Sequence, residues 1–273
     1  MLAFWLAAAA HAAPLGTVTV MDGRAHVARG LGVSAPAEGS VLEEGDLLAL
    51  EDGALLQVEL ADGTLLSFAS GAQAMLPAHA GGKPGDLLLA AGWVKFNLAA
   101  PAQLAAVATP QVRLLAPKST YVVNTGAAGT QLFLETGEVV PTFAASRPGQ
   151  PAVVRGGDFV AVKADSSVTV ARRPPPAFVS AMPKVYLDRL PVRLSKLRAK
   201  NVALKPEREA GFDDLQAWVR RYPQARAAIL ARFEPKLQDK DFLAQLQPVI
   251  KDYPEWEAAV RPEKPHAKKA KAK

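Results

Sequence analysis

The sequence predicts an α+β protein arranged by segments: a mainly β N-terminal domain of many short strands, followed by a small α-helical C-terminal module. Two observations carry this prediction. Between residues 15 and 171, short apolar runs alternate with turns that contain Gly, Asp or Pro, as is typical of strands. After Pro174, Pro175 and Pro176, apolar residues recur at three- and four-residue steps, as is typical of helices.

The clearest strand-and-turn pattern covers residues 43–68, which read EEGDLLALEDGALLQVELADGTLLSF. Asp46, Asp52 and Asp62 each stand beside a glycine between two apolar runs. An Asp-Gly pair supplies a residue that tolerates positive φ and a carboxylate that can bond the backbone of the turn. Apolar residues at every second position of 56–60 share one strand face. Because aromatic residues are only 7% of the chain, we expect a core of Leu, Val and Ala.

The strand pattern continues through the N-terminal domain, which we place at 14–172. Expected strands are 17–20, 25–28, 47–50, 54–60, 64–68, 86–89, 93–97, 105–108, 112–116, 120–125, 131–135, 138–141, 159–162 and 168–171. No helix-period segment interrupts them, which argues against a parallel βαβ sheet. A solenoid or roll and a sandwich both fit this pattern.

The proline run marks the end of the β pattern, because three consecutive prolines favour polyproline II and fit neither a sheet nor a helix interior. We expect a Pro-rich linker over 173–181 and a helical module over 182–260. Expected helical segments are 182–197 (broken or restarted at Pro191), 212–219, 223–233 and 239–251, with a last turn at 253–256 that anchors Trp256.

The first ten residues are apolar, and the run ends in Ala10-His11-Ala12, which places small residues where a signal peptidase cleaves. We therefore expect a signal peptide over 1–12 and export to the periplasm; the alternative is a buried N-terminal helix. No Lys or Arg precedes the apolar run, so we expect the natural start to lie upstream. No apolar run reaches the roughly 18–20 residues that a membrane helix needs.

The formal net charge of +6 is concentrated at the C-terminal end. Residues 261–273 hold six basic residues and one acidic residue, which gives this tail a charge of +5. This distribution argues against nucleic acid as a partner. A tail of Ala, Lys and Pro is typical of a disordered, solvated end, and Lys268 and Lys269 could carry it onto an anionic envelope surface.

The sequence favours no catalytic, cofactor or metal site. There is no cysteine, no HExxH and no GxSxG, and the glycine-rich run 81–86 lacks phosphate-loop spacing, so a plain turn is favoured. Calcium ligation by Asp46, Asp52 and Asp62 is disfavoured, since they lie six and ten residues apart; we expect them to cap turns. The acidic pairs 43–44 and 213–214 fit a turn and a helix start better than acid–base catalysis.

Several motifs, in order, resemble the FecR-like domain family of bacterial envelope proteins. They are GTV at 16–18, LEEGD at 42–46, LADGTLL at 60–66, ATP at 108–110 and GTQL through TGEVV at 129–140. The resemblance covers nearly all of 16–171. The family often has Gly-Thr where this chain reads Lys118-Ser119-Thr120, so that turn differs. The segments 183–191 and 253–256 resemble the tail of some stand-alone FecR-domain proteins.

The best-known members of the family join a cytoplasmic anti-sigma segment to a periplasmic domain that receives signals from an outer-membrane receptor. The resemblance here implies the periplasmic domain, in a stand-alone protein without the anti-sigma segment or membrane helix. We therefore expect a non-catalytic periplasmic protein that acts through protein–protein interaction in envelope signalling or organisation, with an envelope receptor or signalling component as partner. The alternative is a binder of an envelope polymer, peptidoglycan or polysaccharide. Both leave the oligomeric state open.

Large aromatic and basic residues are the candidates for an interaction surface. We name Trp93, Trp218, Arg220 and Arg221, together with the tail residues Lys268 and Lys269. Trp93 and Phe96 lie three residues apart and so face opposite sides of a regular strand. For the aromatic residues the alternative role is core packing.

Overall fold

The computed structural model describes residues 12–79, 83–99, 103–115, 118–146, 149–197 and 200–260. The chain divides into two compact units, the β unit up to Arg208 and the helical unit from Glu209. The predicted class, a mainly β domain followed by a small helical module, is confirmed. The predicted signal peptide (1–12, of which only Ala12 is described) and the basic tail (261–273) otherwise lie outside the described residues.

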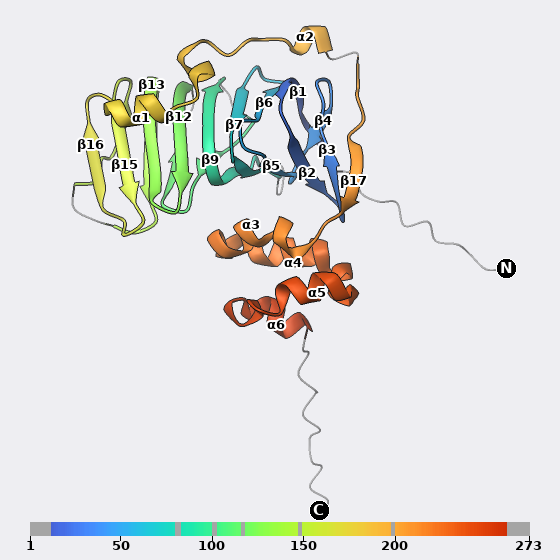
Figure 1. Ribbon diagram of the computed structural model, residues 1–273. Helices are drawn as coiled ribbons and strands as arrows, with labels where there is room; N and C mark the ends of the chain where they lie inside the picture. The colour runs from blue at the N-terminus through green and yellow to red at the C-terminus, as the bar shows by residue number, and fades with distance from the viewer. Residues whose placement is uncertain are drawn as a thin grey trace, which may run out of the picture. The chain divides into compact units, whose positions relative to one another are not determined.

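Seventeen strands form one hydrogen-bonded network (Figure 1). The first nine are β1 (Pro14–Asp22), β2 (Ala25–Arg29), β3 (Gly32–Ala35), β4 (Val41–Glu43), β5 (Leu47–Leu50), β6 (Leu55–Leu60), β7 (Leu65–Ala69), β8 (Gln73–Met75) and β9 (Asp86–Leu98). The others are β10 (Ala106–Ala108), β11 (Val112–Leu115), β12 (Ser119–Gly126), β13 (Gly129–Phe143), β14 (Val154–Arg155), β15 (Phe159–Lys163), β16 (Val168–Ala171) and β17 (Lys205–Glu209).

The network is folded into two facing sheets, so the β unit is a roll. Sheet A runs in the order β4, β1, β6, β7, β9, β12, β13, β15, β16. Sheet B runs in the order β17, β3, β2, β5, β8, β9, β10, β11, β13. The chain passes from sheet B to sheet A between β5 and β6 and returns between β7 and β8.

Two long strands belong to both sheets and bend sharply at a glycine. The first part of β9 pairs with β8 and β10, and the part from Gly92 onward pairs with β7 and β12. Likewise β13 pairs with β12 up to Gly137 and with β11 from Val140. The φ angles of Gly92 and Gly137 are +88° and +91°, in the region that favours glycine.

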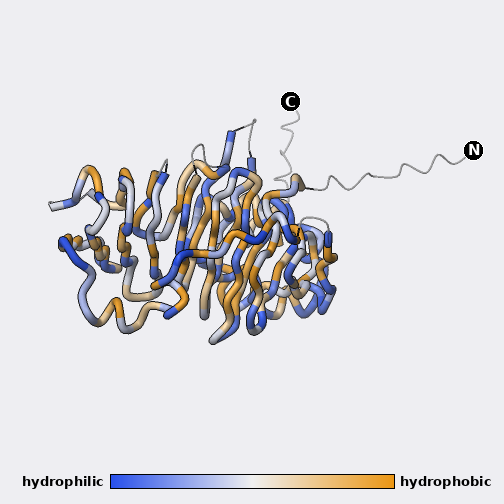
Figure 2. The backbone as a smooth tube through the Cα atoms, turned by 90° about the horizontal axis from the view of Figure 1, so that it is seen from above, coloured by the Kyte–Doolittle hydropathy of each residue, from blue (hydrophilic) through white to orange (hydrophobic). Residues whose placement is uncertain are grey.

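The core lies between the two sheets and consists mainly of Leu, Val and Ala, as the composition predicts. Figure 2 shows apolar and polar positions alternating along the strands. Side chains from sheet B, such as Val27 and Leu48, pack in the same cluster as Val58 and Leu66 from sheet A. Phe96 stacks on Tyr121 within this cluster, with ring centroids 4.8 Å apart.

Strand positions follow the predicted pattern, with instructive differences. The expected pairs of strands 86–89 with 93–97, and 131–135 with 138–141, are each one continuous bent strand, because glycine allows the bend without ending the pairing. The short strands β3, β4, β8 and β14 were not predicted. Each has four residues or fewer, too few to show alternation.

The predicted linker and helical-module boundaries are wrong, because residues 172–204 belong to the β unit. We call this segment the strap; it can be followed as the gold chain through α1 and α2 in Figure 1. It contains α1 (Pro176–Ala181), the 3₁₀ turn η1 (Lys184–Leu187) and α2 (Leu194–Leu197). The predicted helix over 182–197 is not one helix: the segment forms the two separate turns η1 and α2, joined by chain that is not helical. The strap then leads into β17, which pairs with β3.

The helical unit consists of short helices and 3₁₀ turns. They are η2 (Phe212–Asp214), α3 (Gln216–Arg221), η3 (Pro223–Ala225), α4 (Arg226–Phe233), η4 (Glu234–Gln238), α5 (Lys240–Leu246), η5 (Ile250–Asp252) and α6 (Pro254–Val260). Trp256 is buried beside Phe212 and Phe242, which agrees with its predicted anchoring role. Asp239 caps α5, since its carboxylate accepts the amides of Asp241 and Phe242.

An internal repeat organises the helical unit. Residues 219–229 (VRRYPQARAAI) and 250–260 (IKDYPEWEAAV) align without a gap. Tyr222 and Tyr253 hold the same place in each copy, both are buried, and their φ and ψ angles agree within a few degrees. The two copies meet where the Arg226 guanidinium lies 5.0 Å from the centre of the Tyr253 ring, a cation–π contact.

Replacing either corner glycine should destabilise the roll strongly. A Cβ at position 92 would lie 2.4 Å from the backbone of Ala72, and one at position 137 would lie 2.5 Å from the carbonyl of Lys118. We expect Gly92→Ala and Gly137→Ala each to lower the free energy of unfolding by at least about 3 kcal/mol, measured by urea denaturation.

The matched control is Gly63→Ala, which changes a glycine with φ of +86° where an added Cβ meets no atom within 4 Å. That substitution carries only the backbone strain of positive φ, about 1 kcal/mol. Equal losses at all three positions would contradict the role given to the two corners.

Candidate interaction surface

The outer face of sheet A carries polar side chains that the strap covers. Alternation along the strands points Gln57, Glu59 and Lys95 away from the core. An outward position on an antiparallel sheet would normally be solvated. Here all three side chains are buried, because the strap lies over them. Buried polar groups need hydrogen-bond partners, and the strap supplies these from its backbone.

Lys95 on β9 illustrates how completely the strap meets this requirement. Its side chain is 4% exposed. The ammonium group lies 2.6 Å from the carbonyl oxygen of Tyr186, 3.1 Å from that of Asp188 and 2.9 Å from the carboxylate of Glu135. A lysine has three N–H donors, and each has an acceptor here. Two of the three acceptors belong to the strap backbone.

Two neighbouring residues on β6 hold the next part of the strap. The Glu59 carboxylate accepts hydrogen bonds from the consecutive amides of Arg193 and Leu194, each at 3.0 Å. The Gln57 amide group donates to the Pro191 carbonyl oxygen at 2.8 Å. A carboxylate that receives two backbone amides makes charge-assisted bonds, which are stronger than neutral ones. This end of the strap is thus fixed by its main chain.

Aromatic residues fix the other end of the strap. Phe178 of α1 packs against Trp93 and Phe159 of sheet A, with ring centroids 5.0 and 5.1 Å apart. Tyr186 is fully buried, and its hydroxyl donates to the carbonyl oxygen of Ser67 at 2.6 Å. Burial raises the pKa of Tyr186 well above its ordinary value, although the bond to Ser67 acts in the opposite direction.

The prediction that the aspartates of the 43–68 pattern cap turns is confirmed for Asp46 and Asp62. Asp46 is buried, accepts the amide of Glu43 at 2.8 Å and binds the Arg29 guanidinium through both carboxylate oxygens, at 2.9 and 2.6 Å. Glu43 binds the same guanidinium at 2.8 Å. Burial disfavours the charge of Arg29, but the bonds and attraction to Asp46 outweigh it and raise the Arg29 pKa.

The other two aspartates have similar structural roles. Asp62 accepts the amide of Thr64 at 2.8 Å within its own turn and the amide of Gln103 at 2.7 Å across to the next loop. Asp52 lies 3.4 Å from the hydroxyl of Ser70, at the neighbouring corner. Within the described ranges, no group of three or more His, Asp or Glu side chains is arranged to hold a metal ion. The acidic residues of this pattern therefore hold strands and loops together.

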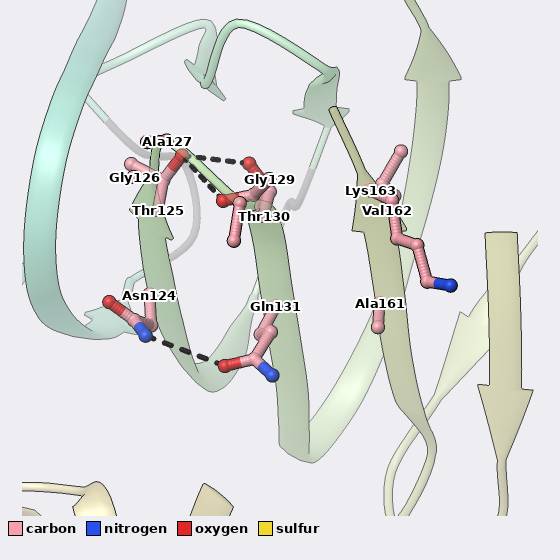
Figure 3. Close-up of a pocket in the computed structure, with 11 residues that line it drawn as sticks. Asn124, Thr125, Gly126, Ala127, Gly129, Thr130, Gln131, Ala161, Val162 and Lys163 are labelled. Atoms are coloured by element: carbon pink, nitrogen blue, oxygen red, sulfur yellow. Dashed lines mark hydrogen bonds between the residues drawn. The ribbon is translucent and has the colours of Figure 1, made fainter. Parts of the chain in front are cut away.

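A cavity of about 420 Å³ opens at the end of the β12–β13 hairpin, beside β15 (Figure 3). Asn124 and Gln131 line it from neighbouring strands, with a long contact of 3.4 Å between their amide groups. Lys163 of β15 is the charged residue in the lining. Its side chain is exposed and makes no ion pair with any described residue. The lining thus includes amide groups and an ammonium group, each of which can bind hydroxyl or carboxylate oxygens of a ligand.

The predicted interaction residues are in different parts of the molecule. Trp93 is half-buried on the outer face of sheet A against Phe178, opposite the buried Phe96, as the strand spacing indicates. Trp218 is 2% exposed and packs in the core of the helical unit, so it is not part of a surface. Arg220 is exposed and Arg221 half-buried at the end of α3.

The remaining predicted residues, Lys268 and Lys269, lie outside the described residues. Sequence reasoning missed the strap itself and its partners Glu59 and Lys95. Two features of the sequence could have indicated it. Strands β6 and β7 have polar residues at outward positions, and the segment after the prolines is rich in basic residues and spaced leucines. The leucine spacing by itself predicts a helix, whereas the outward polar residues of β6 indicate that a further segment covers the sheet.

Comparisons with known proteins give weak structural neighbours. No family model and no curated protein matches the chain. Two crystal structures of a protein assigned as an anti-sigma factor from Parabacteroides distasonis match it at 16% identity with a TM-score of 0.40. Each match covers 46% of this chain and 59% of the solved chain. At this identity and score the likeness carries no argument about the family or the activity of this chain.

Removing the Tyr186 hydroxyl should loosen the strap. We expect Tyr186→Phe to lower the free energy of unfolding by about 1 kcal/mol, because one buried hydrogen bond is lost. Tyr186→Ala should cost about 3–5 kcal/mol, because a cavity is added. Urea denaturation measures both losses, and limited proteolysis within the strap reports its release.

Tyr121→Phe is the matched control, because the Tyr121 hydroxyl is equally buried and has no hydrogen-bond partner among the described residues. Its removal should leave stability unchanged or slightly raised. A loss at Tyr121 that equals the loss at Tyr186 would contradict the role of the strap hydrogen bond.

Alkaline pH should weaken the β unit through these two tyrosines. Burial raises both pKa values above the ordinary 10.0, so the folded state holds a proton that the unfolded state releases. Their contribution is present below pH 10 and is lost as the pH rises further. The double variant Tyr121→Phe/Tyr186→Phe should show a shallower decline of unfolding free energy above about pH 10. An unchanged slope would contradict this assignment.

Proposed function

We propose that this is a non-catalytic periplasmic protein of the FecR-like type that acts through protein–protein interaction in envelope signalling or organisation. The order of motifs over 16–171 supports the family, and the apolar start of the chain supports export. The proposed partner is an envelope receptor or signalling component.

The proposal that the protein is non-catalytic rests on one observation: the buried charged side chains of the β unit bind other parts of the β unit. General acid–base catalysis needs a titratable group that faces a substrate site. Asp46 binds Arg29, Asp62 binds two loop amides, and Glu59 and Lys95 bind the strap. These contacts commit the buried charges of the β unit to structure. The helices in the described ranges include none that is long and apolar enough to cross a membrane.

Crosslinking in envelope preparations, followed by mass spectrometry, tests the proposal. We expect one reproducible envelope protein to be recovered with the wild-type chain. Its recovery should fall at least about fivefold with Arg220→Glu/Arg221→Glu, because charge reversal at an interface adds repulsion. The matched control is Lys240→Glu/Lys251→Glu, which reverses two exposed charges elsewhere in the helical unit.

Two outcomes would contradict the proposal. Recovery of no reproducible protein partner would remove the protein–protein interaction itself. Equal loss with both pairs of substitutions would show that Arg220 and Arg221 have no special role and that only net charge matters.

A second candidate function is binding of an envelope polymer, peptidoglycan or polysaccharide, and the cavity beside Lys163 favours it. Sugar hydroxyl and carboxylate groups match the amide and ammonium groups that line this cavity. Pull-down on the isolated polymer should then weaken several-fold with Gln131→Ala/Lys163→Ala and be unaffected by Lys251→Ala. Binding that is indifferent to the cavity substitutions would reject this candidate.

A further inference from the structure

The basic charge of the described chain is concentrated in the strap. Residues 172–204 include eight basic residues and one acidic residue, a formal charge of +7. The preceding part of the β unit, 12–171, includes nine basic and fourteen acidic residues, a formal charge of −5. A strongly basic segment is therefore laid over an acidic domain. Electrostatic attraction between the strap and the domain would account for this charge distribution only if the strap cations bound acidic groups of the domain.

Most of the strap cations do not bind the domain beneath. Arg193 pairs with Glu38 at 2.7 Å, and Arg172 pairs with Asp158 at 3.1 Å. The others among the described residues are exposed and make no ion pair with any described residue; they are Arg173, Lys184, Arg189, Lys196 and Lys200. The strap is held instead through its backbone carbonyls and amides and through buried aromatic rings. Its cations are left for a partner outside the β unit.

The same outer surface exposes aliphatic side chains between the cations. Leu187 is 65% exposed and Val192 is 71% exposed, the highest values among the large exposed hydrophobic side chains of the described residues. Val179 and Val185 add to this surface at about two-fifths exposure. The aromatic residues of the strap, Phe178 and Tyr186, point the other way into the protein. The outer surface thus combines exposed Leu and Val side chains with Lys and Arg side chains that make no ion pair with a described residue.

We propose that the outer surface of the strap docks on an anionic phospholipid bilayer. Lys184 and Arg189 flank Leu187 in the sequence, so cationic groups would meet lipid phosphates while the aliphatic side chain enters the headgroup region. Attraction of basic residues to acidic lipid and burial of apolar area add together in such binding. The strap also binds without reorganisation, because its backbone is already fixed to sheet A.

An acidic protein partner fits this surface less well. Protein interfaces draw most of their affinity from buried aromatic and Arg anchors that fill pockets on the partner. The strap directs its aromatic rings inward and presents separate aliphatic side chains on a segment that lies on top of the sheet. A polyanionic polysaccharide would match the cations but would give Leu187 and Val192 nothing apolar to contact. A bilayer matches both features.

Vesicle co-sedimentation of the full chain tests this assignment. The probe is phosphatidylcholine vesicles with and without phosphatidylglycerol, at low and high salt. We expect binding only with phosphatidylglycerol, weakened by salt. Leu187→Ser/Val192→Ser should weaken binding about tenfold. Lys184→Glu/Arg189→Glu should weaken it by at least about tenfold. All four side chains are exposed, so the fold should persist, which thermal denaturation checks.

Controls separate the strap from net charge and from the basic tail. Val140→Ser/Val170→Ser removes exposed valines outside the strap, and Lys240→Glu/Lys251→Glu reverses charges elsewhere; both should leave binding within about twofold. Replacing the five tail lysines with Gln should leave binding that still depends on Leu187 and Val192.

Three results would overturn the proposal. One is binding that is lost with the tail lysines alone. Another is binding that falls equally with control and strap charge reversals. The third is binding to dextran sulfate that matches binding to the vesicles and is indifferent to Leu187→Ser/Val192→Ser, which would assign the surface to polyanions.

Discussion

The β unit depends on one physical constraint: charged and amide side chains on the outer face of sheet A are buried, and they need partners. Lys95 and Glu59 sit in the middle of that face, each 4% exposed. Leaving either charge unpaired would cost several kcal/mol, so something must cover the face with matching backbone groups. The strap does so with the carbonyls of Tyr186 and Asp188 and the amides of Arg193 and Leu194. The roll is therefore complete only with the strap, which follows the last strand predicted from the sequence, 168–171.

This constraint also sets which surfaces are available for function. Because the strap meets sheet A mainly with its backbone and its aromatic rings, most of its Lys and Arg side chains are exposed and make no ion pair with a described residue; Arg172 and Arg193 are the exceptions. Asp46 and Asp62 of the β unit bind backbone amides of turns, so these carboxylates have a structural role. The proposed binding surfaces are therefore the outside of the strap, the cavity beside Lys163, and Arg220 with Arg221 in the helical unit.

The sequence predicted much of the fold and little of the surface. Alternation in 54–60 and the Asp-Gly turns depend on local geometry, so the strands and the turn role of Asp46 and Asp62 could be predicted. The continuity of β9 through Gly92 could not, since a glycine between two apolar runs usually indicates a turn. The sequence predicts a helix where the structure has the strap, because leucines at 187, 190, 194 and 197 have helical spacing. Whether such residues face a helix neighbour or a sheet is decided by long-range contacts. For Trp218 the sequence left an interaction surface and core packing open, and packing within the helical unit places it in the core.

The central claim is that the strap is a fixed layer of the β unit, and amide hydrogen exchange tests it most directly. The amides of Arg193 and Leu194 donate to the buried Glu59, and that of Tyr186 donates within η1. The account predicts that these three exchange as slowly as amides in the middle of β6 and β7, since opening either region disrupts the other. Exchange of the three strap amides at the rate of an unstructured peptide, while β6 and β7 stay protected, would contradict it.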